Sequence, residues 1–222
     1  TEVGDRGGQI EEGEKYTEVV KRTGEKREVR ADELIPYSAS DLDRAVTNPE
    51  QIKTVLEAYK KAIYTDLYPE RAELDPDYHY IPKTLIFAKN KSHARNIVEI
   101  IRHKVFPNQD PQFVQQIIDG EGDSNALIRS FRNDKQFRIA VTVTLVATGT
   151  DVKPLEVLIF MRDVNSESLY IQMKGRGVRT INDDALRNVT PNANSKDLFY
   201  LIDAIGVTEH VKSANNRETI PQ

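Results

Sequence analysis

One segment of the chain carries an amide and two guanidinium groups at a spacing suited to a phosphate, and it reads QMKGRGVR (172–179). If the segment is helical, Gln172, Arg176 and Arg179 stand at positions i, i+4 and i+7 and share one face. Arginine is better suited than lysine to planar, bidentate contact with phosphate oxygens. The two glycines each cost a helix about 1 kcal/mol relative to alanine, so we interpret them as room for another surface. A solvated basic face at a helix end would explain an arginine pair alone; the glutamine and glycines favour phosphate contact.

A second candidate is the Thr/Gly-rich turn ATGTD (147–151), which directly follows a strand-like apolar run. Gly149 permits a positive φ or a close backbone approach. The hydroxyls and amides can face a phosphate, and Asp151 could bind a ribose hydroxyl or orient an arginine. An ordinary strand-to-helix turn with a capping residue explains this segment alone equally well.

The third candidate is the polar, basic segment Lys89-Asn90-Lys91-Ser92-His93, which follows another apolar run. It suits a nucleic-acid backbone, and a capped helix start with solvated lysines is the alternative. The four histidines are scattered and there is no cysteine, so the sequence predicts no metal site.

These segments require strands and helices that alternate along the chain. Apolar runs of strand length lie at 84–88, 113–118, 137–143, 157–161 and 198–203, and helical patterns lie at 92–105, after Ser124, which is expected to cap its helix, and at 166–180. Because the strand runs do not alternate in polarity, the pattern predicts an α/β fold, a parallel sheet with helices on both faces. Loops beginning at Lys89, Thr144 and Arg162 should therefore open on one edge, at the carboxyl ends of the strands, where ligands bind.

The first 82 residues lack this alternation of apolar strand runs and helices. Residues 16–30 read as a polar hairpin around Thr23-Gly24. Thr47 stands three residues before Glu50 and close to a proline, which predicts a helix start. An apolar stripe runs from Ile52 to Ile63 at helical spacing. The proline-rich, acidic stretch 68–82 reads as a linker.

Composition narrows the class of protein. The 222 residues carry a net charge of -4, which excludes bulk coating of nucleic acid and leaves a local basic stripe possible. No apolar run reaches membrane-spanning length and no signal peptide is visible. Zero cysteine fits a cytoplasmic protein. The chain starts without methionine, so we expect a fragment.

Together the three segments resemble the second RecA-like lobe of superfamily 2 helicases. TLIFAKNKSHA is similar to motif IV, IAVTVTLVATGTDV to motif V, and QMKGRGVR to motif VI with its Q-x-x-G-R-x-x-R core. TGTDVKPLEVLIFMRDV, QMKGRGVRTI and LIDAIGVTE resemble the motor (R) subunit of type I restriction enzymes more narrowly. The resemblance implies an inter-lobe spacer at 1–82, with the hairpin and helix, a helicase C-terminal domain at 83–209, and a tail at 210–222 toward a further C-terminal region.

The resemblance also implies roles for individual residues. Arg176 and Arg179 would act as arginine fingers on ATP, with Gln172 in support. The nucleotide cleft would include three further residues: Gly149, Asp151 and Gly175. The DNA backbone would contact Lys89, Asn90, Lys91 and Thr148. The implied partners are double-stranded DNA, a first RecA-like lobe and nuclease domain of the same subunit, and methylation and specificity subunits.

The chain departs from the family pattern in two respects. Thr144 stands where the family usually has an acidic residue. No G-x-x-x-x-G-K-[ST] loop, Asp-Glu-x-His box or nuclease-like set of carboxylates and lysine occurs, so ATP and Mg²⁺ would be held mainly by a first lobe and the chain alone should be inactive. Another superfamily 2 motor, for DNA repair or RNA unwinding, and a non-catalytic RecA-like binding module are the alternatives.

Overall fold

The computed structural model describes residues 8–10, 15–19, 26–30, 35–37, 47–118, 122–143, 152–162, 171, 175 and 179–205. The chain divides into two compact units, Thr1–Ala45 and Val46–Gln222. The second unit therefore begins well before residue 83, and the helix that starts near Pro49 belongs to the same unit as the sheet. The assignment of residues 1–82 to an inter-lobe spacer stays a prediction.

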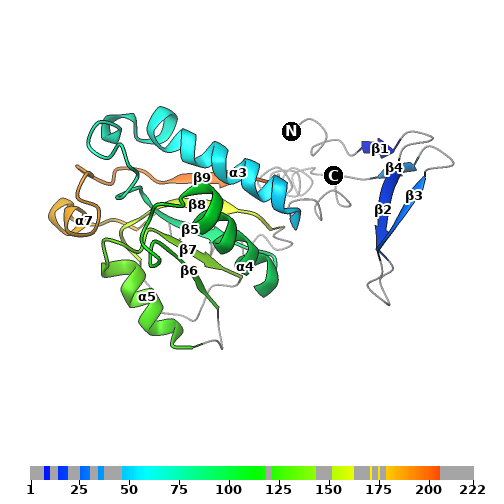
Figure 1. Cartoon of the computed structure of the whole chain (residues 1–222). Helices are drawn as coiled ribbons and strands as arrows, with labels where there is room; N and C mark the ends of the chain where they lie inside the picture. The colour runs from blue at the N-terminus through cyan, green and yellow to red at the C-terminus, as the bar shows by residue number, and fades with distance from the viewer. Residues whose placement is uncertain are drawn as a thin grey trace, which may run out of the picture. The chain divides into compact units, whose positions relative to one another are not determined.

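The N-terminal unit contains two antiparallel strand pairs (Figure 1). Strand β2 (Lys15–Val19) pairs antiparallel with β3 (Lys26–Arg30), which confirms the strand pairing of the predicted hairpin, while its turn at Thr23-Gly24 lies outside the described residues. Strand β1 (Gly8–Ile10) pairs with β4 (Ile35–Tyr37), a pairing that the sequence did not predict.

The second unit is built on a five-stranded parallel sheet with the order β6-β7-β5-β8-β9. Phe87 at the end of β5 lies opposite Thr142 of β7 and Phe160 of β8, so these three strands end at one level. The five predicted strands and their parallel arrangement are thereby confirmed. Their bounds are Lys83–Phe87 for β5, Val114–Ile117 for β6, Ile139–Thr142 for β7, Leu155–Phe160 for β8 and Tyr200–Asp203 for β9.

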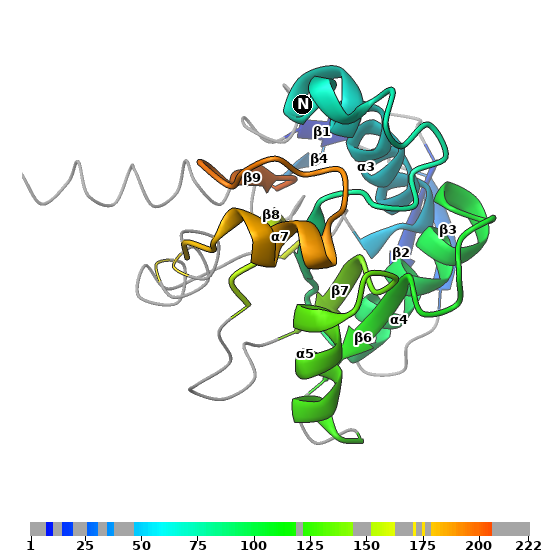
Figure 2. The same cartoon turned by 90° about the vertical axis from the view of Figure 1, so that its left-hand side faces the viewer.

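Helices cover both faces of this sheet. Helices α3 (Pro49–Ala62) and α4 (Lys91–Ile100) pack against each other, and Figure 1 shows α5 (Ser124–Asn133) apart from them. Figure 2 shows the same elements turned by 90°. Helix α3 continues into a π-helical turn at Ile63–Leu67, and α4 into one at Ile101–Val105. The predicted amphipathic helix after Thr47 is confirmed, since its Ile52, Leu56 and Tyr59 are buried.

The alternating direction of strand side chains divides the core between the two faces. Ile86 packs in the cluster that contains residues of α3 and α4, whereas its neighbours Leu85 and Phe87 pack in the cluster that contains Ile128 and Phe131 of α5. Each strand thus contributes apolar side chains to both faces, which explains the continuous apolar runs in the sequence.

Two predicted helix caps are wrong by one residue. The side chain of Asn48, not Thr47, caps α3 and accepts a hydrogen bond from the Glu50 amide at 2.9 Å. The side chain of Asp123, not Ser124, caps α5. The Ser124 side chain is buried, and its hydroxyl instead donates to the Ile118 carbonyl at 3.0 Å.

The stretch 68–82 is packed and is not a loose linker. It contains a 3₁₀ turn, η3 (Pro69–Arg71). The Asp75 carboxylate accepts hydrogen bonds from the Tyr64 hydroxyl and from the amides of His79 and Tyr80, the latter two at 2.8 Å. A single buried carboxylate thus organises a segment whose prolines and acids had indicated a linker.

A further helix, α7 (Asp183–Val189), was not predicted. Its signals are visible in retrospect, because the Asn182 side chain accepts from the Asp184 amide at 2.9 Å and Leu186 and Val189 are buried at helical spacing. In the ranges that the structure describes, no helix is long and apolar enough to cross a bilayer.

Candidate functional site

The carboxyl ends of three strands meet at one edge of the sheet. The Ala88 amide donates to the Thr142 carbonyl at 2.7 Å, and the Met161 amide donates to the Phe87 carbonyl at 3.0 Å. The Arg162 guanidinium, just after β8, reaches across to the Val143 carbonyl, just after β7, at 2.9 Å. The loops that begin at Lys89 and Arg162 therefore open on one edge as predicted, while Thr144 lies outside the described residues.

The segment Lys89–Lys91 forms the exposed start of α4 at this edge. All three residues are exposed. The Asn90 side chain caps the helix by accepting from the His93 amide at 2.9 Å. The capped helix start is thus present, and it places two exposed lysines next to the helix N-terminus, where anions are favoured. Their contact with DNA stays a prediction.

His93 is the last residue of the predicted basic segment, and no role of its own was predicted for it because the four histidines are scattered. Its side chain is buried, and the ring Nδ1 accepts a hydrogen bond from the Lys89 amide at 3.0 Å. Burial lowers the pKa of His93 to about 4, with a smaller contribution from the charge of Lys89. The ring is therefore neutral at pH 7. A histidine three residues after an N-cap asparagine is the sequence signal that could have drawn attention to it.

Arg179 lies elsewhere, near the amino end of β8. It is exposed, and its carbonyl accepts from the Lys196 ammonium at 2.7 Å. The same ammonium donates to the Lys153 carbonyl at 2.8 Å, two residues before β8 begins. A six-residue strand spans about 20 Å, so Arg179 and Lys89–Lys91 stand at opposite ends of the central strands. Arg179 therefore does not lie at the carboxyl edge on which the loops at Lys89 and Arg162 open.

Gly175 is half-buried, and its amide donates to the Ile171 carbonyl at 2.8 Å, an i to i−4 helical bond. Most of the helix predicted for 166–180 lies outside the described residues. The remaining predicted site residues lie outside the described part of the chain: Thr148, Gly149, Asp151, Gln172 and Arg176.

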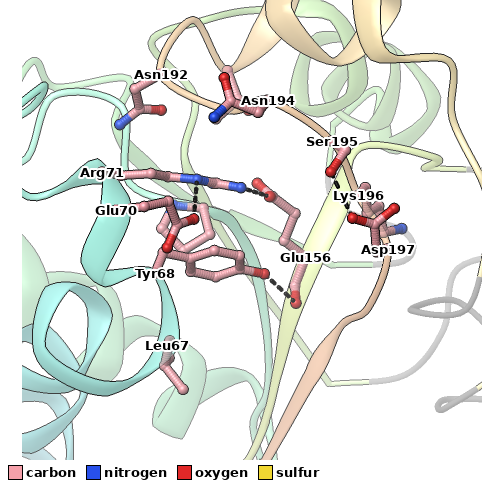
Figure 3. A network of polar contacts seen from close by, with 12 residues as sticks. Leu67, Tyr68, Glu70, Arg71, Glu156, Asn192, Asn194, Ser195, Lys196 and Asp197 are labelled. Carbon is pink, nitrogen blue, oxygen red and sulfur yellow. Dashed lines mark hydrogen bonds and ion pairs between the residues drawn. The ribbon is translucent and has the colours of Figure 1, made fainter.

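A network of buried charges holds the segment after α3 against the sheet (Figure 3). The Arg71 guanidinium of η3 donates to the Glu156 carboxylate of β8 at 2.7 Å, and both side chains are almost completely buried. The Tyr68 ring lies against the guanidinium, 4.0 Å from its centroid. Both side chains are enclosed by protein, so we assign this pair a structural role.

A second buried arginine closes the amino-terminal edge of the sheet. Arg138 is completely buried and donates to the Ile81 carbonyl, to the Val189 carbonyl at 2.6 Å and to the Thr190 hydroxyl at 2.9 Å. It ties the start of β7 to the end of α7. Within the described ranges no cluster of His, Asp or Glu is arranged to hold a metal ion.

Comparisons with known proteins agree with this architecture. The model of the helicase conserved C-terminal domain matches residues 67–180, just over half of the chain. The chain is 29% identical over 174 residues to the type I restriction enzyme EcoKI endonuclease subunit of Escherichia coli K12, a match that covers 75% of this chain and 14% of that protein. The chain thus spans about one seventh of the length of that relative.

Two solved structures share the fold. One is a fragment assigned to an HsdR subunit of a type I restriction enzyme from Vibrio vulnificus YJ016, with a TM-score of 0.51, 20% identity, and coverage of 78% of this chain and 32% of that chain. The other is the Mss116p DEAD-box helicase domain 2 bound to an RNA duplex, with a TM-score of 0.51, 13% identity, and coverage of 74% and 57%. The present chain, with its parallel sheet and its match to the family model, therefore belongs to the helicase conserved C-terminal domain family. It has a RecA-like fold and is related to the endonuclease subunit of type I restriction enzymes.

Proposed function

We propose that this chain is the second motor lobe of a type I restriction enzyme R subunit, which couples ATP hydrolysis to the translocation of double-stranded DNA. The observation that carries the proposal is the placement of two basic groups on one RecA-like domain. Exposed Lys89 and Lys91 lie at the carboxyl edge of the sheet, and exposed Arg179 lies by the amino end of β8. One lobe can therefore face DNA and a nucleotide at different places.

In this proposal Arg176 and Arg179 contact the phosphates of ATP held on a first lobe, and Gln172 supports them. Arginine side chains suit this task because their planar donors match phosphate oxygens and stabilise charge in the transition state. Bound ATP and Mg²⁺ supply the phosphoryl group and its charge neutralisation. Gly149, Asp151 and Gly175 line the cleft between the lobes.

In this proposal the residues at the carboxyl edge of the sheet contact DNA. Lys89, Lys91 and the amide nitrogen of Asn90 face the phosphate backbone, together with Thr148. These contacts are independent of sequence, because phosphates carry no base identity. Site recognition therefore belongs to a specificity subunit, methylation to another, and DNA cleavage to a nuclease domain. The assembled enzyme acts in the cytoplasm, and this chain alone hydrolyses no ATP.

The test is to change each arginine to alanine in a protein that joins this chain to its first lobe. Loss of a transition-state arginine should lower DNA-stimulated ATP hydrolysis by on the order of 10³-fold, with ATP binding retained. Arg129→Ala is the matched control, because Arg129 is an exposed arginine on α5. If Arg176→Ala and Arg179→Ala both hydrolyse ATP within tenfold of the unchanged protein, the assignment is wrong.

A further inference from the structure

A buried polar side chain lies directly beneath the basic segment Lys89–Lys91. His93 is only 3% exposed, on the first turn of α4. Its ring Nδ1 accepts from the Lys89 amide, and its own amide donates to the Asn90 side chain. One residue thus holds the two positions before the helix, one through its side chain and one through its backbone.

The helical cap and the ring perform different tasks. The bond from the His93 amide to Asn90 would form with any residue except proline at position 93, because it uses the backbone N–H. The bond to the Lys89 amide needs an acceptor on the side chain of residue 93. Without that acceptor the Lys89 amide would have to turn toward another partner, and the backbone between β5 and α4 would change direction.

The other ring nitrogen indicates why histidine, and not an apolar residue, is suited to this position. Because Nδ1 accepts, the proton of the neutral ring lies on Nε2, which is buried and has no hydrogen-bond partner among the described residues. A buried donor without a partner is unfavourable. An apolar side chain of similar size would avoid this penalty, so the contribution of His93 to this site is its acceptor.

We propose that His93 is a positioning residue for DNA binding, whose ring acceptor fixes the Lys89 amide and so directs Lys89 and Lys91 toward the phosphate backbone. This inference rests on the proposed DNA contact of these two lysines. A neutral ring is needed for the acceptor, and the lowered pKa of His93 agrees with this requirement. Lys89 is the charged group that faces the ring and contributes to that shift.

Two substitutions separate the acceptor from simple packing. His93→Asn keeps an oxygen near the position of Nδ1, whereas His93→Leu keeps an apolar side chain of similar size and has no acceptor. In the motor with its first lobe, His93→Leu should raise the DNA concentration for half-maximal ATP hydrolysis by about tenfold, the usual effect of one hydrogen bond. The rate at saturating DNA should change less than twofold. His93→Asn should stay close to the unchanged protein.

A second measurement reports on the loop without using activity. Hydrogen exchange of the Lys89 amide in this chain should be slow in the unchanged protein and in His93→Asn, and fast in His93→Leu. The proposal is overturned if leucine leaves either this exchange or the DNA dependence unchanged, or if asparagine and leucine behave alike. Lys89→Ala/Lys91→Ala serves as the reference: if it leaves the DNA dependence unchanged, the proposed DNA contact itself fails, whatever the exchange result.

Discussion

At the scale of single residues, the buried pair of Arg71 and Glu156 makes the sharpest stability prediction. Replacing Glu156 with glutamine removes the buried counter-charge of the Arg71 guanidinium, which should cost about 3 kcal/mol or more of the free energy of unfolding. Urea unfolding measures it. The control is Glu70→Gln, because Glu70 lies 3.6 Å from the same guanidinium but is 55% exposed, and its loss should cost less than about 1 kcal/mol.

The double variant Arg71→Met/Glu156→Leu distinguishes the pair from its surroundings. Apolar residues of similar volume often replace a buried ion pair without loss. The double variant should therefore be more stable than Glu156→Gln alone. If the double variant is no more stable than Glu156→Gln, apolar side chains cannot replace this ion pair, and the prediction is contradicted.

At the scale of elements, the sequence predicted whatever depends on local periodicity. The five strands and the apolar stripe of α3 follow from spacing that a few neighbouring residues determine. The identity of a cap depends on which of two adjacent polar side chains can turn back to the helix, and Asn48 was preferred to Thr47. The packing of residues 68–82 depends on Glu156, which lies 85 positions after Arg71, and no local pattern contains that partner.

The start of α4 makes a pH prediction through His93. Its folded pKa of about 4 lies below the ordinary value of 6.5, so the unfolded chain binds the proton more readily and stability falls as the pH drops from 6.5 through 4. The loss should reach at most about 3 kcal/mol. Urea unfolding at pH 7, 5.5 and 4 should show a smaller decrease for His93→Asn. The exposed His103→Gln is the control, and an equal decrease in all three proteins would contradict the prediction.

At the scale of the whole molecule, the sequence predicted which loops lie at one edge of the sheet. It did not predict that the basic residues Lys89 and Lys91 lie at the opposite end of the strands from Arg179. The carboxyl ends of β5, β7 and β8 meet because the strands are parallel and in register. The position of Arg179 is fixed here by Lys196, which joins the Arg179 carbonyl to the Lys153 carbonyl. The spacing of residues within a sequence motif does not reveal that Arg179 and Lys89–Lys91 lie at opposite ends of the central strands.

The central claim is that one lobe serves DNA and ATP at two separate places, and a DNA-titrated ATP hydrolysis assay of the complete motor tests it most directly. Arg179→Ala should lower the maximal rate on the order of 10³-fold with the half-maximal DNA concentration unchanged. Lys89→Ala/Lys91→Ala should raise that concentration roughly 10- to 100-fold with the maximal rate unchanged. The exposed pair Lys61→Ala/Lys135→Ala is the matched control.

Combining the arginine and lysine changes completes this measurement. The account predicts that their free-energy effects add within about 0.5 kcal/mol, as expected for sites more than about 10 Å apart. A lysine variant that loses maximal rate as severely as Arg179→Ala, or an arginine variant that loses DNA affinity instead of rate, would contradict the account.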